Sequence, residues 1–482
     1  MLIRTAVSLA VGCMVLCVAE PSAPPRAEAG ETSTAAPAAA NDEPQLIETD
    51  RVTRHGITWT LAAPARVGRF VNGDYYVVGP VTIVDIDPKP GAGRNGSVLN
   101  PPPLSDRSGF DSRSPGGRYD PKLSAALPIR LSPGDALVSS ISVERVGELP
   151  APLRLADRTI SPVRSVSVLT CLAAPAPADA FRPSYCDREQ KIYLARRLRR
   201  ELLPKLKPVE GPPAEAGWVS KADPAEWARR FERTWMDTCF FGFDAPVEYM
   251  PHYGREVGRA VGMASLVLML DLPEAEKEPL LIGFVQYGID LWGIARAGHP
   301  GWPAHGGHGN GRKWPIVFAG ILLDDKAMQS PTASCPNVRF GEDMQTMHGR
   351  GWTGATALYA GHIGADGEKH QKGWGAYEHL PPEQWPGMLG ENYRRCCTNN
   401  AWVAQALAAR LLGAEKIWNH DAFFDYVDRW MEEDDTAAIE AIKRATGTDY
   451  SAPWLRQGQA WDPFVLAMWK AYRHRQPAAQ LK

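Results

Sequence analysis

The chain has almost no excess of charge of either sign. It carries 53 Lys and Arg against 55 Asp and Glu, a formal net charge of −2 over 482 residues. Proteins that bind nucleic acid or anionic membrane surfaces usually carry an excess of basic side chains. The charge balance therefore removes the electrostatic argument for either partner, and we expect no nucleic acid partner.

Long hydrophobic runs are scarce beyond the first residues. Residues 1–19 contain one early Arg, an apolar run and a small residue at Ala19, which is typical of an export signal cleaved near that position. A membrane span needs about 20 apolar residues, so we expect no stable span. Residues 20–45 are rich in Ala, Pro, Ser and Thr and are predicted to be a disordered linker. We predict a periplasmic or extracellular protein, with lipid attachment at Cys13 as the less favoured alternative.

Metal and redox motifs are missing as well. His305-x-x-His308 has the spacing of metal ligands, but no HExxH frame accompanies it. The vicinal pair Cys396–Cys397 lacks the spacing of a CxxC redox motif or a zinc site. We therefore predict no metal and no cofactor. A disulfide between Cys171 and Cys186 would close a plausible short loop in an exported protein.

Residues 46–172 have the pattern of β-structure. Ile57, Trp59 and Leu61 alternate with polar residues, as in a half-buried strand. The run RFVNGDYYVVGPVTIVDI contains two apolar segments with turn residues between them, and LPIRLSPGDALVSSISV repeats that arrangement. Lys89–Asp120 is a long loop rich in Gly, Pro, Ser and Arg, of a kind that is usually functional or disordered. We predict an antiparallel β-sandwich domain.

Residues 187–475 are predicted to be helical. QKIYLARRLRRELLPKL is amphipathic and basic, which predicts a helix with a solvated outer face. Later segments are apolar nearly all round and must be buried among other helices. We predict a larger α/α toroid after the sandwich, an α+β fold overall. The helical segments include GREVGRAVGMASLVLMLDL, KEPLLIGFVQYGIDLWGIAR, WPIVFAGILL, NAWVAQALAARLLGAEKIW, DAFFDYVDRWMEE and DPFVLAMWKAYR.

The loop WPAHGGHGNGRKW, Trp302–Trp314, lies between two of these apolar segments. A polar, Gly-rich loop held on a rigid scaffold commonly displays functional groups. Fifteen of the 16 Trp follow residue 200, and a loop Trp can stack on the flat face of a sugar ring. We expect this loop to be the centre of a site, through Trp302, His305, His308, Asn310, Arg312 and Lys313.

Two further polar clusters precede apolar helices. EYMPHYGRE, Glu248–Glu256, supplies His252, Tyr253 and Arg255, with spacings that place His252 and Arg255 on one helix face. ENYRRCCTNNAW, from residue 391 to 402, supplies Tyr393 and Arg394. Because the loops of a toroid converge at one end, we expect the three clusters to meet.

These residue types suit β-elimination on a uronic-acid polysaccharide. The developing enolate is doubly negative, so the enzyme must neutralise the sugar carboxylate and supply a base and an acid. Asn310, His308 and Arg312 suit neutralisation, while Tyr253, Tyr393 and His305 suit the base and acid roles. An ionised Tyr is costly, since its ordinary pKa is about 10, and Arg255 or Arg394 would help. The predicted substrate-binding residues are His252, Arg255, Trp302, Arg312, Lys313 and Arg394.

Three other functions stay open. An inverting glycoside hydrolase needs two carboxyls about 6.5–9.5 Å apart, and the candidates are Glu256, Asp290, Glu342, Asp343 and Glu378. A metal site at His305 and His308 is the second alternative. A non-catalytic carbohydrate-binding or envelope protein is the third, although it leaves the concentration of ionisable groups in Gly-rich loops unexplained.

A resemblance supports carbohydrate chemistry. With VNGDYYVVGPVTI in a short β-domain followed by a helical domain, the chain looks like a secreted planctomycete-type protein. Over residues 225–475 its Asn, His, Tyr and Arg resemble those of α/α-toroid polysaccharide lyases. In several of those families an Asn and a His are adjacent, whereas here Gly309 separates His308 from Asn310. The resemblance implies a lyase that acts on an anionic polysaccharide or oligosaccharide.

Overall fold

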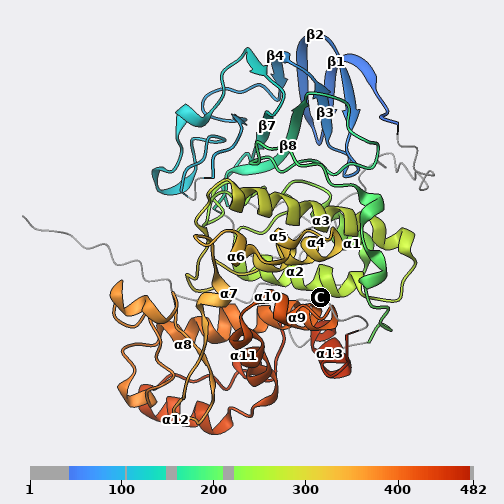
Figure 1. Cartoon of the computed structure of the whole chain (residues 1–482). Coiled ribbons are helices and arrows are strands. Elements are labelled where there is room, and N and C mark those ends of the chain that lie inside the picture. Colours follow the sequence, from blue (N-terminus) through green and yellow to red (C-terminus); the bar gives the residue numbers. More distant parts are fainter. Residues whose placement is uncertain (1–42, 104–105, 148–159, 210–221, 478–482) are drawn as a thin grey trace, which may run out of the picture. The chain divides into compact units, whose positions relative to one another are not determined.

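A computed structural model describes residues 43–103, 106–147, 160–209 and 222–477 (Figure 1). The predicted export signal and nearly all of the predicted linker lie outside these residues. The described chain is a mixed α and β structure, with a curled sheet in its N-terminal part and helices in its C-terminal part. This confirms the predicted order of β-rich and helical parts.

The sheet has eight strands, in the order β5-β7-β8-β3-β2-β4-β6, with β1 paired to β2. The pair β3 and β8 is parallel, and the other pairs are antiparallel. The strands are β1 Ile47–Arg54, β2 Ile57–Arg69, β3 Tyr75–Val78, β4 Val81–Asp87, β5 Ser97–Leu99, β6 Ile129–Leu131, β7 Ala136–Ser142 and β8 Val163–Leu172.

The alternation in β2 is confirmed. Ile57, Trp59 and Leu61 are buried, whereas Thr58 and Thr60 between them are only partly buried. The antiparallel sandwich is not confirmed, because the named strands of residues 46–172 all belong to the one curled sheet. The parallel contact of β3 with β8 is a long-range pairing that local alternation does not reveal.

The helical part is built on four buried helices, α2 Gly254–Leu268, α3 Glu274–Arg296, α4 Lys313–Leu322 and α9 Asn399–Leu411. The other helices are α1 Pro224–Phe231, α5 Lys326–Gln329, α6 Pro331–Ser334, α7 Gly341–Met344, α8 Leu389–Tyr393, α10 Glu415–Trp418, α11 Asp421–Glu432, α12 Thr436–Thr446 and α13 Pro463–Tyr472. Short strand pairs β9 Gly301–Trp302 with β10 Arg339–Phe340, and β11 Thr346–His348 with β12 Ala357–Tyr359, lie between them. A closed ring of helix pairs is not confirmed.

Close helix packing explains two glycines. A Cβ on Gly262 of α2 would lie 2.5 Å from the Ala404 Cβ of α9, and one on Gly288 of α3 would lie 2.3 Å from the Pro315 carbonyl oxygen of α4. Both contacts are closer than carbon atoms tolerate, so these positions require glycine. The apolar segments around them are helices, as their composition predicts.

The predicted basic helix is wrong. Residues 190–206 contain only two short 3-10 turns, Ala195–Arg197 and Arg200–Leu202. The Arg199 amide donates to the Leu322 carbonyl oxygen at the end of α4, and Arg200 pairs with Glu278 of α3 at 2.5 Å. The segment lies along the helices in a mostly non-helical conformation because its hydrogen bonds and ion pairs go to them.

The sheet and the helices share a hydrophobic core. Val163, Val166 and Val168 of β8 belong to the same buried cluster as Trp235 and Tyr249 of the segment before α2. The fully buried Arg182 lies between the two parts, with ion pairs of 2.8 Å to Asp74 and 2.6 Å to Asp290. The two parts are therefore packed together in the described chain.

The sequence left the disulfide pairing open, and the structure does not form the plausible Cys171–Cys186 loop. Cys171 and Cys186 are both free and buried, and Cys186 donates a hydrogen bond to the Pro101 carbonyl oxygen at 3.2 Å. The bonded cysteines are instead the vicinal pair Cys396 and Cys397. Spacing along the chain could not show this, because Cys171 belongs to the core of the sheet and Cys186 to the separate core that the sheet shares with the helices.

No helix within the described residues is both long enough and apolar enough to pass through a bilayer, in agreement with the expectation for this part of the chain.

Candidate functional site

The backbone of Trp302–Trp314 is fixed by close contacts at its glycines. The Gly306 amide donates to the His362 carbonyl oxygen at 2.9 Å, and the Gly307 amide donates to the Tyr253 hydroxyl at 3.2 Å. Gly311 has a φ of +89°, and a Cβ there would lie 2.6 Å from the Gly258 nitrogen of α2. The loop is therefore a rigid structure whose shape depends on glycine.

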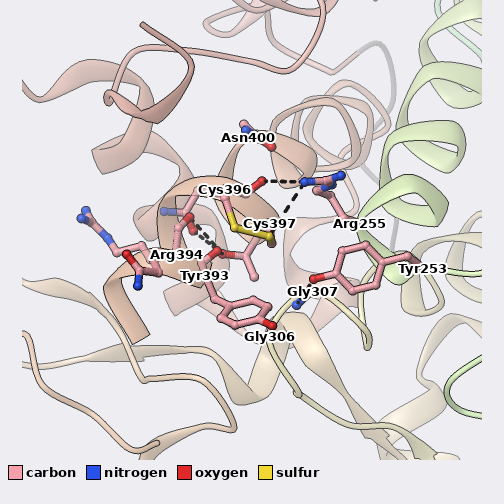
Figure 2. Close-up of a disulfide and its surroundings, with 12 residues drawn as sticks. Tyr253, Arg255, Gly306, Gly307, Tyr393, Arg394, Cys396, Cys397 and Asn400 are labelled. Atoms are coloured by element: carbon pink, nitrogen blue, oxygen red, sulfur yellow. Dashed lines mark hydrogen bonds between the residues drawn. A yellow bond between two sulfur atoms is a disulfide. The ribbon is translucent and has the colours of Figure 1, made fainter. Parts of the chain in front are cut away.

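The three predicted clusters meet at Gly306 and Gly307 (Figure 2). The Tyr253 hydroxyl, from the first cluster, lies against Gly307, while the ring of Tyr393, from the third, lies against Gly306. A Cβ on Gly306 would be 2.3 Å from the Tyr393 ring. The two tyrosines are thus brought to one turn of the central loop, as a convergence of the clusters requires.

Three histidines lie around this turn. The rings of His305 and His308 have centroids 6.1 Å apart, and His362, from the loop after β12, lies 5.0 Å from His305. Tyr253 meets the His308 ring at 4.6 Å, and Tyr393 meets the His362 ring at 4.5 Å, both edge to face. We refer to His305, His308, His362, Tyr253 and Tyr393 as the histidine–tyrosine cluster.

Aromatic side chains border the cluster. Phe241, from the segment between α1 and α2, lies 4.8 Å from His308 and 5.4 Å from His305. Trp374 lies 5.4 Å from His305 and 5.2 Å from His362. Both are half-buried, as are His305 and His308, so the cluster is partly open to solvent. Such aromatic faces can stack on sugar rings.

Burial keeps the histidines neutral. It lowers the pKa of His308 and of His362 to about 3, and the neighbouring His305 acts in the same direction on both. The pKa of His305 is lowered by burial too. At neutral pH these rings are therefore uncharged, and the low pKa makes them weak bases unless a bound negative charge raises it. In the described structure the buried Nδ1 atoms of His308 and His362 have no hydrogen-bond partner.

Burial keeps the two tyrosines protonated. It raises the pKa of Tyr393, and it raises that of Tyr253 despite the opposing charge of Arg255, whose guanidinium carbon lies 5.6 Å from the Tyr253 ring centre. A phenol held in its neutral form is a proton donor, so these side chains suit the acid role better than the base role.

Two residues expected to neutralise a carboxylate instead hold the loop together. Asn310 is fully buried; it donates to the Cys397 carbonyl oxygen at 3.2 Å and accepts from the Trp402 indole at 3.0 Å. Arg312 is also buried, with an ion pair of 2.8 Å to Asp237 and hydrogen bonds to loop carbonyls. Their polar atoms are directed into the protein.

Three predicted substrate-binding residues are likewise interior. Trp302 is fully buried, and its indole donates to the Asp237 carbonyl oxygen. Lys313 is fully buried and paired with Asp343. Arg394 is 3% exposed and bonded to Glu391 and to the Tyr426 hydroxyl, among other partners. The structure brings none of the three to the half-buried surface of the cluster.

Arg255 and His252 lie at the edge of the cluster. The Arg255 side chain is 26% exposed, pairs with Glu256 at 2.6 Å and donates to the Cys396 carbonyl oxygen at 3.3 Å (Figure 2). The charge on a protonated His252 contributes to the lowered pKa of His308.

The carboxyl groups that a hydrolase could use are held by structural contacts instead. Glu256, Asp290, Asp343 and Glu378 are each paired with a basic side chain. Glu342 is fully buried and accepts from the Gly311 amide at 2.6 Å, and burial raises its pKa to about 7. No two of these carboxyls belong to the histidine–tyrosine cluster.

Metal binding has no preformed geometry here. Among the described residues, no three His, Cys, Asp or Glu side chains are arranged to hold a metal ion, although three histidine rings lie close together.

Sequence reasoning missed two members of the site. His362 lies in YAGHIGADG, and Phe241 in CFFGF, which looks like ordinary core sequence. Their only sequence signal is proximity to glycines, and their roles depend on long-range contacts with the central loop. Trp374 lies between two glycines in the segment KGWG and is half-buried.

No protein-family model, curated protein or solved structure matches this chain. The function is therefore inferred from the geometry of the site.

Proposed function

We propose that this chain is an exported polysaccharide lyase that cleaves a uronic-acid-containing polysaccharide by β-elimination at the histidine–tyrosine cluster. One observation carries the proposal: separate chain segments bring two protonated tyrosines and three neutral histidines together, with the tyrosines, His305 and His308 half-buried and His362 buried. A neutral imidazole accepts a proton and a neutral phenol donates one, which are the two transfers that β-elimination needs.

The chemistry assigns roles within the cluster. His305, His308 or His362 takes the proton from the carbon next to the sugar carboxylate. Electrons from that C–H bond form the new carbon–carbon double bond, the glycosidic C–O bond breaks, and Tyr253 or Tyr393 protonates the leaving oxygen. A bound carboxylate would raise the pKa of the histidine nearest to it, because a negative charge favours the protonated ring.

This assignment differs from the one expected from sequence. We assign the role of the base to a histidine instead of a tyrosine, because burial raises the pKa of both tyrosines. Asn310, Arg312 and Lys313 support the loop. Aromatic contact with the sugar comes from Trp374 and Phe241.

The finer description of the fold belongs to the same proposal. The buried helices α2, α3, α4 and α9 are compatible with an incomplete α/α toroid, and the curled sheet with an open relative of a sandwich.

The direct test is turnover of defined polymers. The purified protein is incubated with alginate, glucuronan, pectate and glycosaminoglycans, while the ultraviolet absorbance of unsaturated uronates and the number of reducing ends are followed. We expect both signals to rise together on at least one polymer. New reducing ends without the absorbance would overturn the lyase in favour of the hydrolase, and glycan binding without either signal would favour a scaffold protein.

Variants of the cluster locate the chemistry. We expect His308→Gln and Tyr253→Phe each to lower kcat by about 10²- to 10⁴-fold, the usual contribution of a positioned acid or base. The matched control is His370→Gln, because His370 is exposed beyond the 3-10 turn Ala365–Lys369. Thermal melting confirms that each variant is folded. Full activity in both variants, and also in His305→Gln, His362→Gln and Tyr393→Phe, would place the chemistry elsewhere.

A further inference from the structure

Arg118 is a basic residue from the N-terminal part that reaches the border of the histidine–tyrosine cluster. It follows the 3-10 turn Pro115–Gly117 in the segment Lys89–Asp120, which the sequence predicts to be one long loop and which in the structure contains strand β5. Its guanidinium carbon lies 4.2 Å from the ring centre of Phe243 and 5.9 Å from that of Phe241. A cation over an aromatic face is held there by the ring's negative charge distribution.

The backbone around Arg118 is fixed to both parts of the chain. The Ser108 amide donates to the Arg118 carbonyl oxygen at 3.0 Å, and the Asp120 amide donates to that of Ser108 at 2.9 Å. The Cys239 thiol, two residues before Phe241, donates to the Arg107 carbonyl oxygen at 2.9 Å. The segment that carries Arg118 is thus tied to the segment that carries Phe241.

Among the described residues, Arg118 has no acidic partner of the kind that other buried or half-buried arginines of the site have. Arg312 pairs with Asp237, Arg394 with Glu391, and Arg255 with Glu256. Within the described ranges Arg118 makes no ion pair, and its buried Nε atom has no hydrogen-bond partner. A buried N–H without an acceptor is unfavourable, so the guanidinium of Arg118 is held in place without the internal partners that satisfy the other arginines.

We propose that Arg118 binds an oxyanion of the substrate, a carboxylate or a sulfate, beside the histidine–tyrosine cluster. This inference rests on the proposed function and deepens it, because it makes an acidic sugar the ligand. A guanidinium presents paired N–H groups that match the two oxygens of a carboxylate or the oxygens of a sulfate.

The position of Arg118 fits recognition of a glycan better than chemistry on it. The Phe241 ring lies 5.9 Å from the guanidinium carbon of Arg118, and its centre is 5.4 Å from that of His305 and 4.8 Å from that of His308. A sugar ring stacked on Phe241 can therefore direct its acidic group toward Arg118 while a neighbouring sugar contacts the histidines. Arg118 is accordingly a specificity-determining residue contributed by the Lys89–Asp120 loop.

Protection from chemical modification tests this without requiring turnover. An arginine-selective α-dicarbonyl reagent is applied to the full chain, and the modification of Arg118 is measured by peptide mass spectrometry. We expect glucuronate, glucose 6-sulfate or both to slow modification of Arg118 several-fold, and glucose to have no effect. Comparison of glucuronate with the sulfate ester distinguishes the two oxyanions. Equal modification of Arg118 with and without every anion would overturn the proposal.

Variants provide the second measurement. On any polymer from the panel that binds, we expect Arg118→Gln to weaken binding at least tenfold, with Arg118→Lys intermediate. Arg66→Gln, at an exposed position on β2, is the matched control and should leave binding unchanged. Unaltered binding by Arg118→Gln, with loss of turnover in His308→Gln, would overturn this inference and leave the lyase standing. Protection of Arg118 in a protein that cleaves no polymer would support the oxyanion site and contradict the lyase.

Discussion

At the residue scale, burial decides which polar side chains take part in chemistry. Asn310 and Arg312 lie in the same short loop as His305 and His308, yet the first two are wholly buried and bonded internally. The sequence could identify the loop and its residue types. It could not separate the interior side chains from the displayed ones, because a Gly-rich segment has no periodicity that marks an inward face.

Arg312 gives a prediction that separates support from substrate binding. We expect Arg312→Ala to lower the free energy of unfolding by about 3–5 kcal/mol, because it leaves Asp237 buried without its cation. Urea denaturation measures the change. Arg66→Gln, on the exposed face of β2, should change it by less than about 0.5 kcal/mol. An Arg312→Ala protein of normal stability that no longer bound polysaccharide would show that the substrate contacts Arg312 after all.

At the scale of elements, the composition of a segment predicted which segments are buried helices, but it did not predict which segments pack against each other. Segments that are apolar all round became α2, α3, α4 and α9, since only buried helices tolerate such composition. The basic segment at residues 190–206 failed as a helix because its partners lie on α3 and α4, far away in the sequence. Short-range patterns carry no information about such contacts.

The π-helical turn Arg394–Thr398 contains the vicinal disulfide, and its carbonyl groups hold the site. Asn310 donates to the Cys397 carbonyl oxygen and Arg255 to that of Cys396. Replacing both cysteines by serine should lower kcat on the cleaved polymer severalfold, since the carbonyls lose a covalent constraint. Because the two cysteines are adjacent, the closed loop is minimal, and we expect global stability to change by less than about 1 kcal/mol.

Hydrogen exchange distinguishes a local effect from unfolding in that double variant. The amides of Gly307 and Asn310 should exchange faster than in the parent protein, while the amides in the middle of α3 keep their protection. The control replaces Cys335, which is free and half-buried, by serine. Faster exchange throughout α3 would mean that the disulfide supports the whole fold.

At the scale of the whole molecule, groups with shifted pKa values act in opposite directions on stability. The lowered pKa of His362 means that the unfolded chain binds its proton more readily, so stability falls as the pH drops from about 6.5 toward 3. Glu342 and Asp244, whose pKa values are raised to about 7, change stability in the opposite direction. The folded state binds their protons between pH 4 and 7, so their contribution to stability rises as the pH drops. In the parent protein these opposite dependences of the free energy of unfolding on pH offset one another.

A variant of His362 isolates the contribution of this histidine to the pH dependence of stability. Between pH 7 and pH 5, His362→Gln should gain stability relative to the parent by up to about 2 kcal/mol, because it no longer excludes a proton on folding. Urea denaturation at the two pH values gives the difference. The exposed His370→Gln serves as the reference and should show no such gain. A difference independent of pH would mean that His362 titrates normally in the folded state.

The contacts between sheet and helices have a consequence for how such chains can vary. Because Arg118 is presented by a loop of the N-terminal part while the histidines belong to the helical part, a recombination event that exchanged one part would change ligand preference without touching the reactive groups. The same exchange would disrupt the shared core at Val163, Val166 and Val168. New specificities should therefore arise through substitutions at the exposed positions of Lys89–Asp120, because Val98 and Phe110 of the same segment belong to that shared core.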